Sequence, residues 1–139
     1  MPKSANYAVK KEENFMKITT FNPLIVTGNA DATIKLFEAL GFERRHKITV
    51  NSGGNDIVNV RMKNADGFYV DVAQIDGVTR DMTMIRMNVD DFEEAYNFLI
   101  GRGFNNPKGD HTVDTKSNRS ACLISPTGFA FDLCQHIKD

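Results

Sequence analysis

The sequence predicts an α+β fold in which a strand–helix–strand–strand–strand (βαβββ) unit occurs twice in tandem. The first observation behind this prediction is an internal repeat. Leu40-Gly41-Phe42 has its counterpart 62 positions later in Arg102-Gly103-Phe104, and residues 66–72 have theirs 61 positions later in residues 127–133. The second observation is length, because 139 residues suit one domain and are too few for two full ones. Residues 16–139 are therefore expected to form a single domain.

The first unit, residues 16–77, begins with a short apolar, β-branched run that ends at Gly28-Asn29. Apolar residues at helical spacing follow as far as Leu40, and Gly41 suits the left-handed position that commonly ends a helix. Alternating apolar and polar residues then predict strands separated by turns rich in Asn and Gly. The expected elements are a strand at 21–27, a helix at 30–40, and strands at 48–50, 57–63 and 68–74.

The second unit, residues 78–139, repeats this order. Asp90-Asp91-Phe92-Glu93 resembles a capping box and predicts the start of a helix that ends at Gly103. The polar stretch 105–119 predicts a loop around a short strand near His111. The remaining strands are expected at 84–89, 121–125 and 129–137, and residues 1–15 form an N-terminal extension outside the repeat.

Composition excludes several classes of function. Lys plus Arg total 17 and Asp plus Glu total 18, so the chain lacks the basic surplus of a general nucleic-acid-binding protein. No apolar run approaches the roughly 20 residues of a membrane span, and no apolar core follows the lysines of the first residues as in a secretory signal. We therefore expect a cytoplasmic protein with no membrane partner, in which Cys122 and Cys134 are free, buried thiols.

The duplicated unit resembles the vicinal oxygen chelate superfamily over residues 17–137. The motifs that carry the resemblance are Leu40-Gly41-Phe42, residues 66–71 and the hairpin at residues 125–133. That group contains glyoxalase I, extradiol dioxygenases, fosfomycin-resistance transferases, methylmalonyl-CoA epimerase and the bleomycin-binding proteins. The resemblance implies the glyoxalase/bleomycin resistance/dioxygenase fold, in which the tandem units form curved mixed sheets with helices on the outer face. It does not imply one activity, because one fold can carry many functions.

The resemblance also implies where a metal would bind. The family places His or Gln on the first strand of each unit and Glu on the last strand of each unit. The matching positions here are Asn22, Met84 (or Thr83, if the offset is 61), Asp71 and Asp132. Asn is a weak neutral ligand, Met suits soft ions, and Asp is one methylene shorter than Glu. We therefore expect no metal and no other cofactor; the alternative is a divalent metal held by Asp71 and Asp132 with His136 as a supplementary ligand.

Strand alternation predicts which side chains face the cavity under the sheets. The apolar triplets Phe68, Val70, Val72 and Phe129, Phe131, Leu133 are expected to face the helices, so the residues between them face inward. The candidate ligand-binding residues are Asn22, Asn59, Arg61, Tyr69, Asp71, Arg86, Asp132 and His136. The two arginines suit a polar or anionic small molecule. The alternative is that Arg61 pairs with Asp71 and Arg86 with Asp132, merely neutralising a polar sheet face.

The leading interpretation is a glyoxalase/bleomycin-resistance-like homodimer that binds a small polar or anionic molecule without a catalytic metal. The two arginines disfavour a cationic drug such as bleomycin. One alternative is a divalent-metal-dependent lyase, isomerase or dioxygenase of the same superfamily with an atypical ligand set. Another is a catalytically inert module with a sealed interior. The sequence identifies no catalytic residue and does not decide whether the protein is an enzyme.

Overall fold

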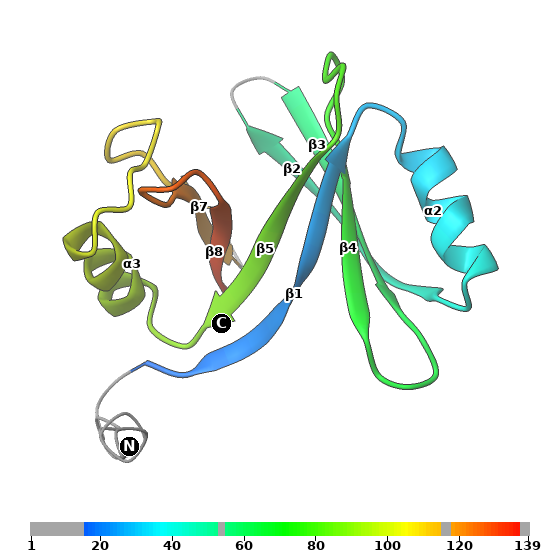
Figure 1. Cartoon of the computed structure of the whole chain (residues 1–139), viewed down its shortest axis with the longest axis horizontal. Coiled ribbons are helices and arrows are strands. Elements are labelled where there is room, and N and C mark those ends of the chain that lie inside the picture. The colour runs from blue at the N-terminus through cyan, green and yellow to red at the C-terminus, as the bar shows by residue number, and fades with distance from the viewer. Residues whose placement is uncertain (1–15, 53–54, 115–117, 137–139) are drawn as a thin grey trace.

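The protein is described by a computed structural model that covers residues 16–52, 55–114 and 118–136; the expected N-terminal extension, residues 1–15, lies outside these ranges. The described residues form one curled sheet of eight strands, with the two helices on its outer side (Figure 1). The first unit contains β1 (Ile18–Thr27), α2 (Ala30–Ala39), β2 (Glu43–Ser52), β3 (Asn55–Lys63) and β4 (Tyr69–Gln74). The second contains β5 (Met82–Val89), α3 (Phe92–Gly101), β6 (Val113–Asp114), β7 (Asn118–Ile124) and β8 (Ala130–His136).

The strand order confirms the duplication. The order is β2-β3-β4-β1-β5-β8-β7-β6, so each unit supplies one half of the sheet. β1 runs parallel to β4, β5 runs parallel to β8, and the two halves join where β1 and β5 pair antiparallel. This register sets Asn22 opposite Arg86 and Arg86 opposite Asp132. Polar residues far apart in sequence therefore meet at the centre of the sheet.

Side-chain caps explain where both helices begin. The Asn29 side chain accepts a hydrogen bond from the backbone N–H of Ala32 at 3.3 Å, and the Asp91 side chain accepts one from Glu94 at 3.1 Å. Each bond satisfies a donor that the first helical turn leaves unpaired. Gly41 and Gly103 follow the helix ends with φ of 102° and 96°, a conformation that suits glycine. The helix ends expected at Gly41 and Gly103 and the helix start expected at residues 90–93 are confirmed, whereas the cap at Asn29 is an addition from the structure.

Each helix packs on the outer face of its own half of the sheet. Between α2 and the sheet, the buried cluster includes Ile34 of the helix with Met62 and Val72 of the strands. Between α3 and the sheet, it includes Phe92 of the helix with Leu133 of the strands. Val72 and Leu133 belong to the two apolar triplets that alternation placed on the helix side. Burying each such side chain stabilises the fold by about 1.5–3 kcal/mol, so packing against the two helices determines which face of the covered strands points outward.

None of the helices is long and apolar enough to cross a membrane, as far as the described residues show.

Two of the outward predictions are wrong. Phe68 and Phe129 were expected against the helices, but 66% and 50% of their surfaces are exposed. β4 begins at Tyr69 and β8 at Ala130, so both phenylalanines precede the strands and lie in the hairpin turns. Alternation applies only within a strand, which is why it fails at these two positions.

Candidate functional site

The concave side of the sheet holds a cavity of about 360 Å³, within the size range of small-molecule sites. Its walls differ in chemistry. The wall formed by the first unit and the start of β5 is mainly apolar, with Leu24, Val26, Ile48, Ile57, Ala73, Ile75, Met82 and Met84. The wall formed by the rest of the second unit is mainly polar, with Asn106, Pro107, Lys108, His111, Val113, Asn118, Ser120, Ala121, Cys122, Asp132 and Cys134. Asn59 and Arg86 complete the lining.

Asp71 is the most deeply buried polar group, with a fully buried side chain. Arg61 lies opposite it across β3 and β4 and binds it through two contacts, Nε to Oδ1 and Nη2 to Oδ2, each 2.9 Å. Asn22 completes the arrangement: its Nδ2 donates to Asp71 Oδ2 at 3.2 Å, and its Oδ1 accepts from Arg61 Nη2 at 3.0 Å. A bidentate, charge-assisted pair of this kind fixes both side chains.

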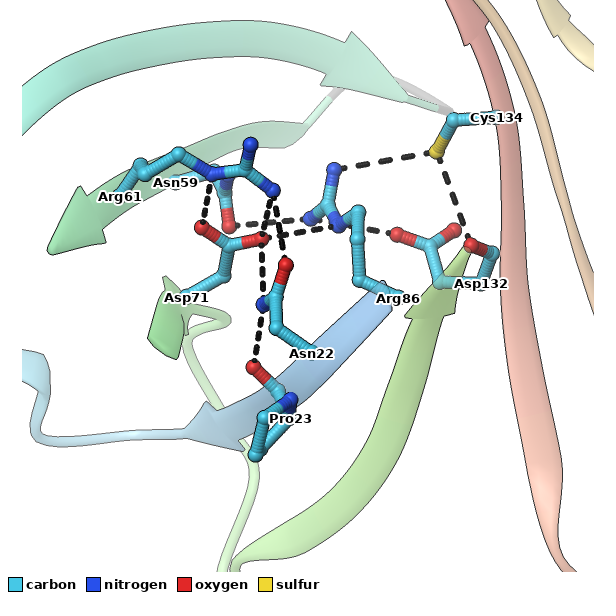
Figure 2. Close-up of polar contacts among 8 residues, drawn as sticks. All are labelled: Asn22, Pro23, Asn59, Arg61, Asp71, Arg86, Asp132 and Cys134. Carbon is cyan, nitrogen blue, oxygen red and sulfur yellow. Dashed lines mark hydrogen bonds and ion pairs between the residues drawn. The ribbon is translucent and has the colours of Figure 1, made fainter. Parts of the chain in front are cut away.

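Arg86 joins this group to the second unit, as Figure 2 shows. Its Nε lies 3.2 Å from Asp71 Oδ2 and its Nη2 lies 3.2 Å from Asp132 Oδ2. The same Nη2 donates to Asn59 Oδ1 at 3.2 Å, while Nη1 lies 3.7 Å from Cys134 Sγ. One guanidinium therefore stands between the two aspartates. Both ion pairs that alternation suggested are present, and Arg86 adds the unexpected contact with Asp71.

Burial and neighbouring charges shift the pKa values of three groups in this cluster, Asp132, Arg86 and Cys134. Burial raises the pKa of the Asp132 carboxyl above its ordinary value, and the attraction of Arg86 only partly opposes that effect. For Arg86, burial acts to lower the pKa, but Asp132, Cys134 and Asp71 together outweigh it and the pKa is raised. Burial also raises the pKa of the Cys134 thiol, as does the charge of Asp132. Arg86 therefore stays a cation, and Cys134 is a protonated thiol at neutral pH.

The donor set does not fit the metal site that the resemblance implies. The two aspartate charges are already balanced by Arg61 and Arg86, and the Arg86 guanidinium lies between the carboxylates. A divalent ion bridging Asp71 and Asp132 would have to displace a buried guanidinium, whose desolvation is offset mainly by those aspartates. No group of three or more His, Cys, Asp or Glu side chains suited to a metal occurs among the described residues.

The rim of the polar wall is a loop that Asn106 holds in shape. Asn106 is buried, with 8% of the residue's surface exposed. Its Nδ2 donates to the Tyr96 hydroxyl at 3.1 Å and to the His111 carbonyl at 3.0 Å, while its Oδ1 accepts from the Lys108 backbone N–H at 2.9 Å. These bonds place Lys108 and His111 at the cavity. Neither residue is among the eight candidates chosen from the sequence, although His111 was placed in the polar run at 105–119, which is the signal that could have found both.

The structure divides the eight candidate residues into three groups. Asn59, Arg86 and Asp132 line the cavity. Asn22, Arg61 and Asp71 lie beneath it as the supporting network. Tyr69 and His136 are in neither group: the Tyr69 ring packs under Arg61 at 5.1 Å, and His136 is exposed at the end of β8, opposite Asn118.

The expectation for the cysteines is half right. Both Cys122 and Cys134 are free, and Cys134 is buried, but Cys122 is exposed. Cys122 lies on the concave face opposite Asp132, where the open cavity leaves it uncovered. Partial desolvation there, with the charge of Asp132, raises the pKa of its thiol.

Comparisons with known proteins identify the fold. No family model matches the chain, and no curated protein matches it. Among solved structures, a methylmalonyl-CoA epimerase is 21% identical with a TM-score of 0.62, covering 84% of this chain and 94% of that chain. Methylmalonyl-CoA epimerase from Mycobacterium tuberculosis is 12% identical with a TM-score of 0.66, covering 87% and 90%. A glyoxalase/bleomycin resistance protein/dioxygenase superfamily member from Vibrio splendidus is 16% identical with a TM-score of 0.57, covering 86% and 99%.

At these identities the likeness concerns the fold and carries no statement about activity. It agrees with the duplicated βαβββ units, the curled mixed sheet and the outer helices described above. The fold class predicted from the sequence is confirmed: the chain has the glyoxalase/bleomycin resistance/dioxygenase fold.

Proposed function

We propose that the protein binds a small molecule in the concave cavity and does so without a catalytic metal. The observation that carries this proposal is the position of Arg86, whose guanidinium contacts Asp71 and Asp132 at 3.2 Å each. A cation that belongs to the chain thus stands between the two carboxylates that a metal would need. The cavity above it supplies the space and the apolar lining that are typical of small-molecule sites.

The proposal is tested by titrating chelator-treated protein with Ni²⁺, Zn²⁺, Mn²⁺, Fe²⁺ and Mg²⁺, followed by calorimetry and by thermal unfolding. A ligand at 100 times its dissociation constant stabilises a fold by about 2.7 kcal/mol, so a tight metal site would be obvious. We expect no stoichiometric binding and no rise in the unfolding temperature.

The same titration with Asp71→Ala and Asp132→Ala makes the result specific to these carboxylates. Asp66→Ala is the matched control, because Asp66 is an exposed aspartate in the β3–β4 turn. Stoichiometric binding that survives Asp66→Ala and disappears in the other two variants would overturn the metal-free proposal. It would favour a metal-dependent lyase, isomerase or dioxygenase instead.

We also propose that the protein is a cytoplasmic homodimer, as expected from its composition and from the resemblance. Gel filtration tests the oligomeric state directly. Elution as a monomer at micromolar concentration would contradict the dimer.

A further inference from the structure

We infer that the cavity selects an amphipathic acid, whose apolar part lies on the wall of the first unit and whose anionic group lies at Lys108 and His111. This inference rests on the proposed small-molecule function and adds the chemical class of the ligand. It also moves the anion-binding role from Arg61 and Arg86, where the sequence placed it, to the rim of the second unit.

The two arginines are poorly placed for a ligand anion. Arg61 does not line the cavity, and its Nε/Nη2 edge is already bound to Asp71. Arg86 does line the cavity, but it is 14% exposed and already contacts Asp71 and Asp132. A ligand carboxylate at Arg86 would also lie close to the charge of Asp132, and like charges repel.

Lys108 has no such competitor. Among the ion pairs of the described residues it takes part in none, and its side chain is exposed at the rim. Lys108 lines the same cavity as Cys122 of β7, and its charge acts to lower the pKa of that thiol against the larger, raising effects of burial and Asp132. Among the described residues, Lys108 is therefore a lining cation that no carboxylate pairs with.

The rim is also preorganised, which makes it a better anion site than a lysine on a free surface. The buried Asn106 side chain binds the loop backbone at two points. It accepts a hydrogen bond from the backbone N–H of Lys108 and donates one to the carbonyl of His111. The backbone N–H of Gly109 donates to the Asn106 carbonyl at 3.0 Å and closes the turn. Backbone pairing between Asn105 and Ile124, with two bonds of 2.8 Å, anchors the loop to the end of β7. Less loop ordering is then needed when a ligand binds.

The opposite wall defines the rest of the ligand. Leu24, Val26, Ala73 and Met84 belong to one apolar cluster at the centre of the sheet, and all four line the cavity. No charged side chain lies on that wall among the described lining residues. A ligand that fills about 360 Å³ between these walls must be apolar on one side and polar or anionic on the other.

The experiment uses three probes that share one apolar chain and differ only in the end group: octanoate, octanamide and octylamine. Each is titrated into the full-length protein at low ionic strength, with binding followed by calorimetry and by amide chemical shifts. We expect octanoate to bind about three- to ten-fold more tightly than octanamide, and octylamine more weakly than either. The preference for octanoate should decrease as salt is added.

Lys108→Met should remove the preference for octanoate and leave the affinity for octanamide unchanged. Lys108→Arg, which keeps the charge, should retain the preference. Lys47→Met is the matched control, because Lys47 is an exposed lysine of β2 that does not line the cavity. Ser120→Phe, which places a large side chain on the polar wall, should weaken all three probes while circular dichroism shows an intact fold.

The outcomes separate this inference from the proposed function. Equal binding of octanoate and octanamide, with both weakened by Ser120→Phe, would overturn the amphipathic-acid inference and support small-molecule binding in the cavity. A preference for octanoate that persists in Lys108→Met would also overturn it, since the anion site would then lie elsewhere. Failure of all three probes to bind would overturn the inference, whereas the metal-free proposal is decided by its own titration.

Discussion

Replacing Arg86 by methionine tests the central claim that this guanidinium balances two buried aspartates. Methionine keeps much of the length of the side chain and removes its charge. Asp71 would retain Arg61, through contacts of 2.9 Å, and the Asn22 amide. Asp132 would lose the one ion pair that the described residues give it, while its side chain is only 20% exposed. The loss should therefore fall mainly on Asp132.

The expected destabilisation follows from that asymmetry. Removing one partner of a buried ion pair costs about 3–5 kcal/mol, because the other charge is left uncompensated. Partial access of water to Asp132 favours the lower end, so we expect a decrease of about 3 kcal/mol in the free energy of unfolding at pH 7. Arg44→Met is the matched control: Arg44 pairs with Glu38 at 3.1 Å, but the two side chains are 52% and 41% exposed. An exposed pair of this kind contributes about 1 kcal/mol or less.

The pH dependence gives a second, independent check. The pKa of Asp132 is already raised in the folded wild type, and loss of Arg86 removes the attraction that opposes this. An acid with a raised folded-state pKa destabilises the fold above that pKa, and the penalty disappears as the pH falls towards the unfolded value. The difference between Arg86→Met and wild type should therefore shrink between pH 7 and about pH 4.

The assay is urea unfolding followed by far-ultraviolet circular dichroism, since the chain contains no tryptophan for fluorescence. The double variant Arg86→Met with Asp132→Asn should recover part of the lost stability, because the uncompensated charge is gone. A loss at pH 7 no larger than that of Arg44→Met would refute the reasoning. So would a loss that stays constant as the pH is lowered.

Two further pairs of positions give matched comparisons. Gly103→Ala should destabilise the fold by about 1–2 kcal/mol in urea unfolding, because the φ of Gly103 is 96° and the new Cβ would lie 3.0 Å from the Pro126 ring. Gly101→Ala should be neutral or stabilising, because Gly101 ends α3 with free space around it. Equal effects of the two substitutions would contradict the backbone argument. In the native protein a thiol reagent should react with Cys122 alone, and slowly at neutral pH, because the pKa of the Cys122 thiol is raised. Cys134 is buried and should react only after unfolding. Fast reaction of both thiols in the native protein would contradict the assigned burial.

The sequence by itself determined the architecture. The Gly-Phe pairs at 41–42 and 103–104 and the repeated hairpin identified the duplication, and helical spacing with the capping segment at 90–93 and the two terminal glycines located both helices. These features depend on contacts within a few residues, or on a pattern that both units share. Alternation within β3 and β8 also separated the inward from the outward side chains correctly, because a strand has only two faces.

Only the tertiary structure decided which inward residues form the site. Arg86 contacts Asp71 as well as Asp132 because the strand order β4-β1-β5-β8 places β5 within reach of both β4 and β8. No local sequence pattern specifies that order. Tyr69 and His136 occupy inward positions of their strands but do not line the cavity, so the correct face did not ensure the correct place. The loop that carries Lys108 is positioned by Asn106 through bonds to groups near it in sequence and on α3. Its location over the cavity depends on how the sheet curls, and the curl results from the packing of all eight strands.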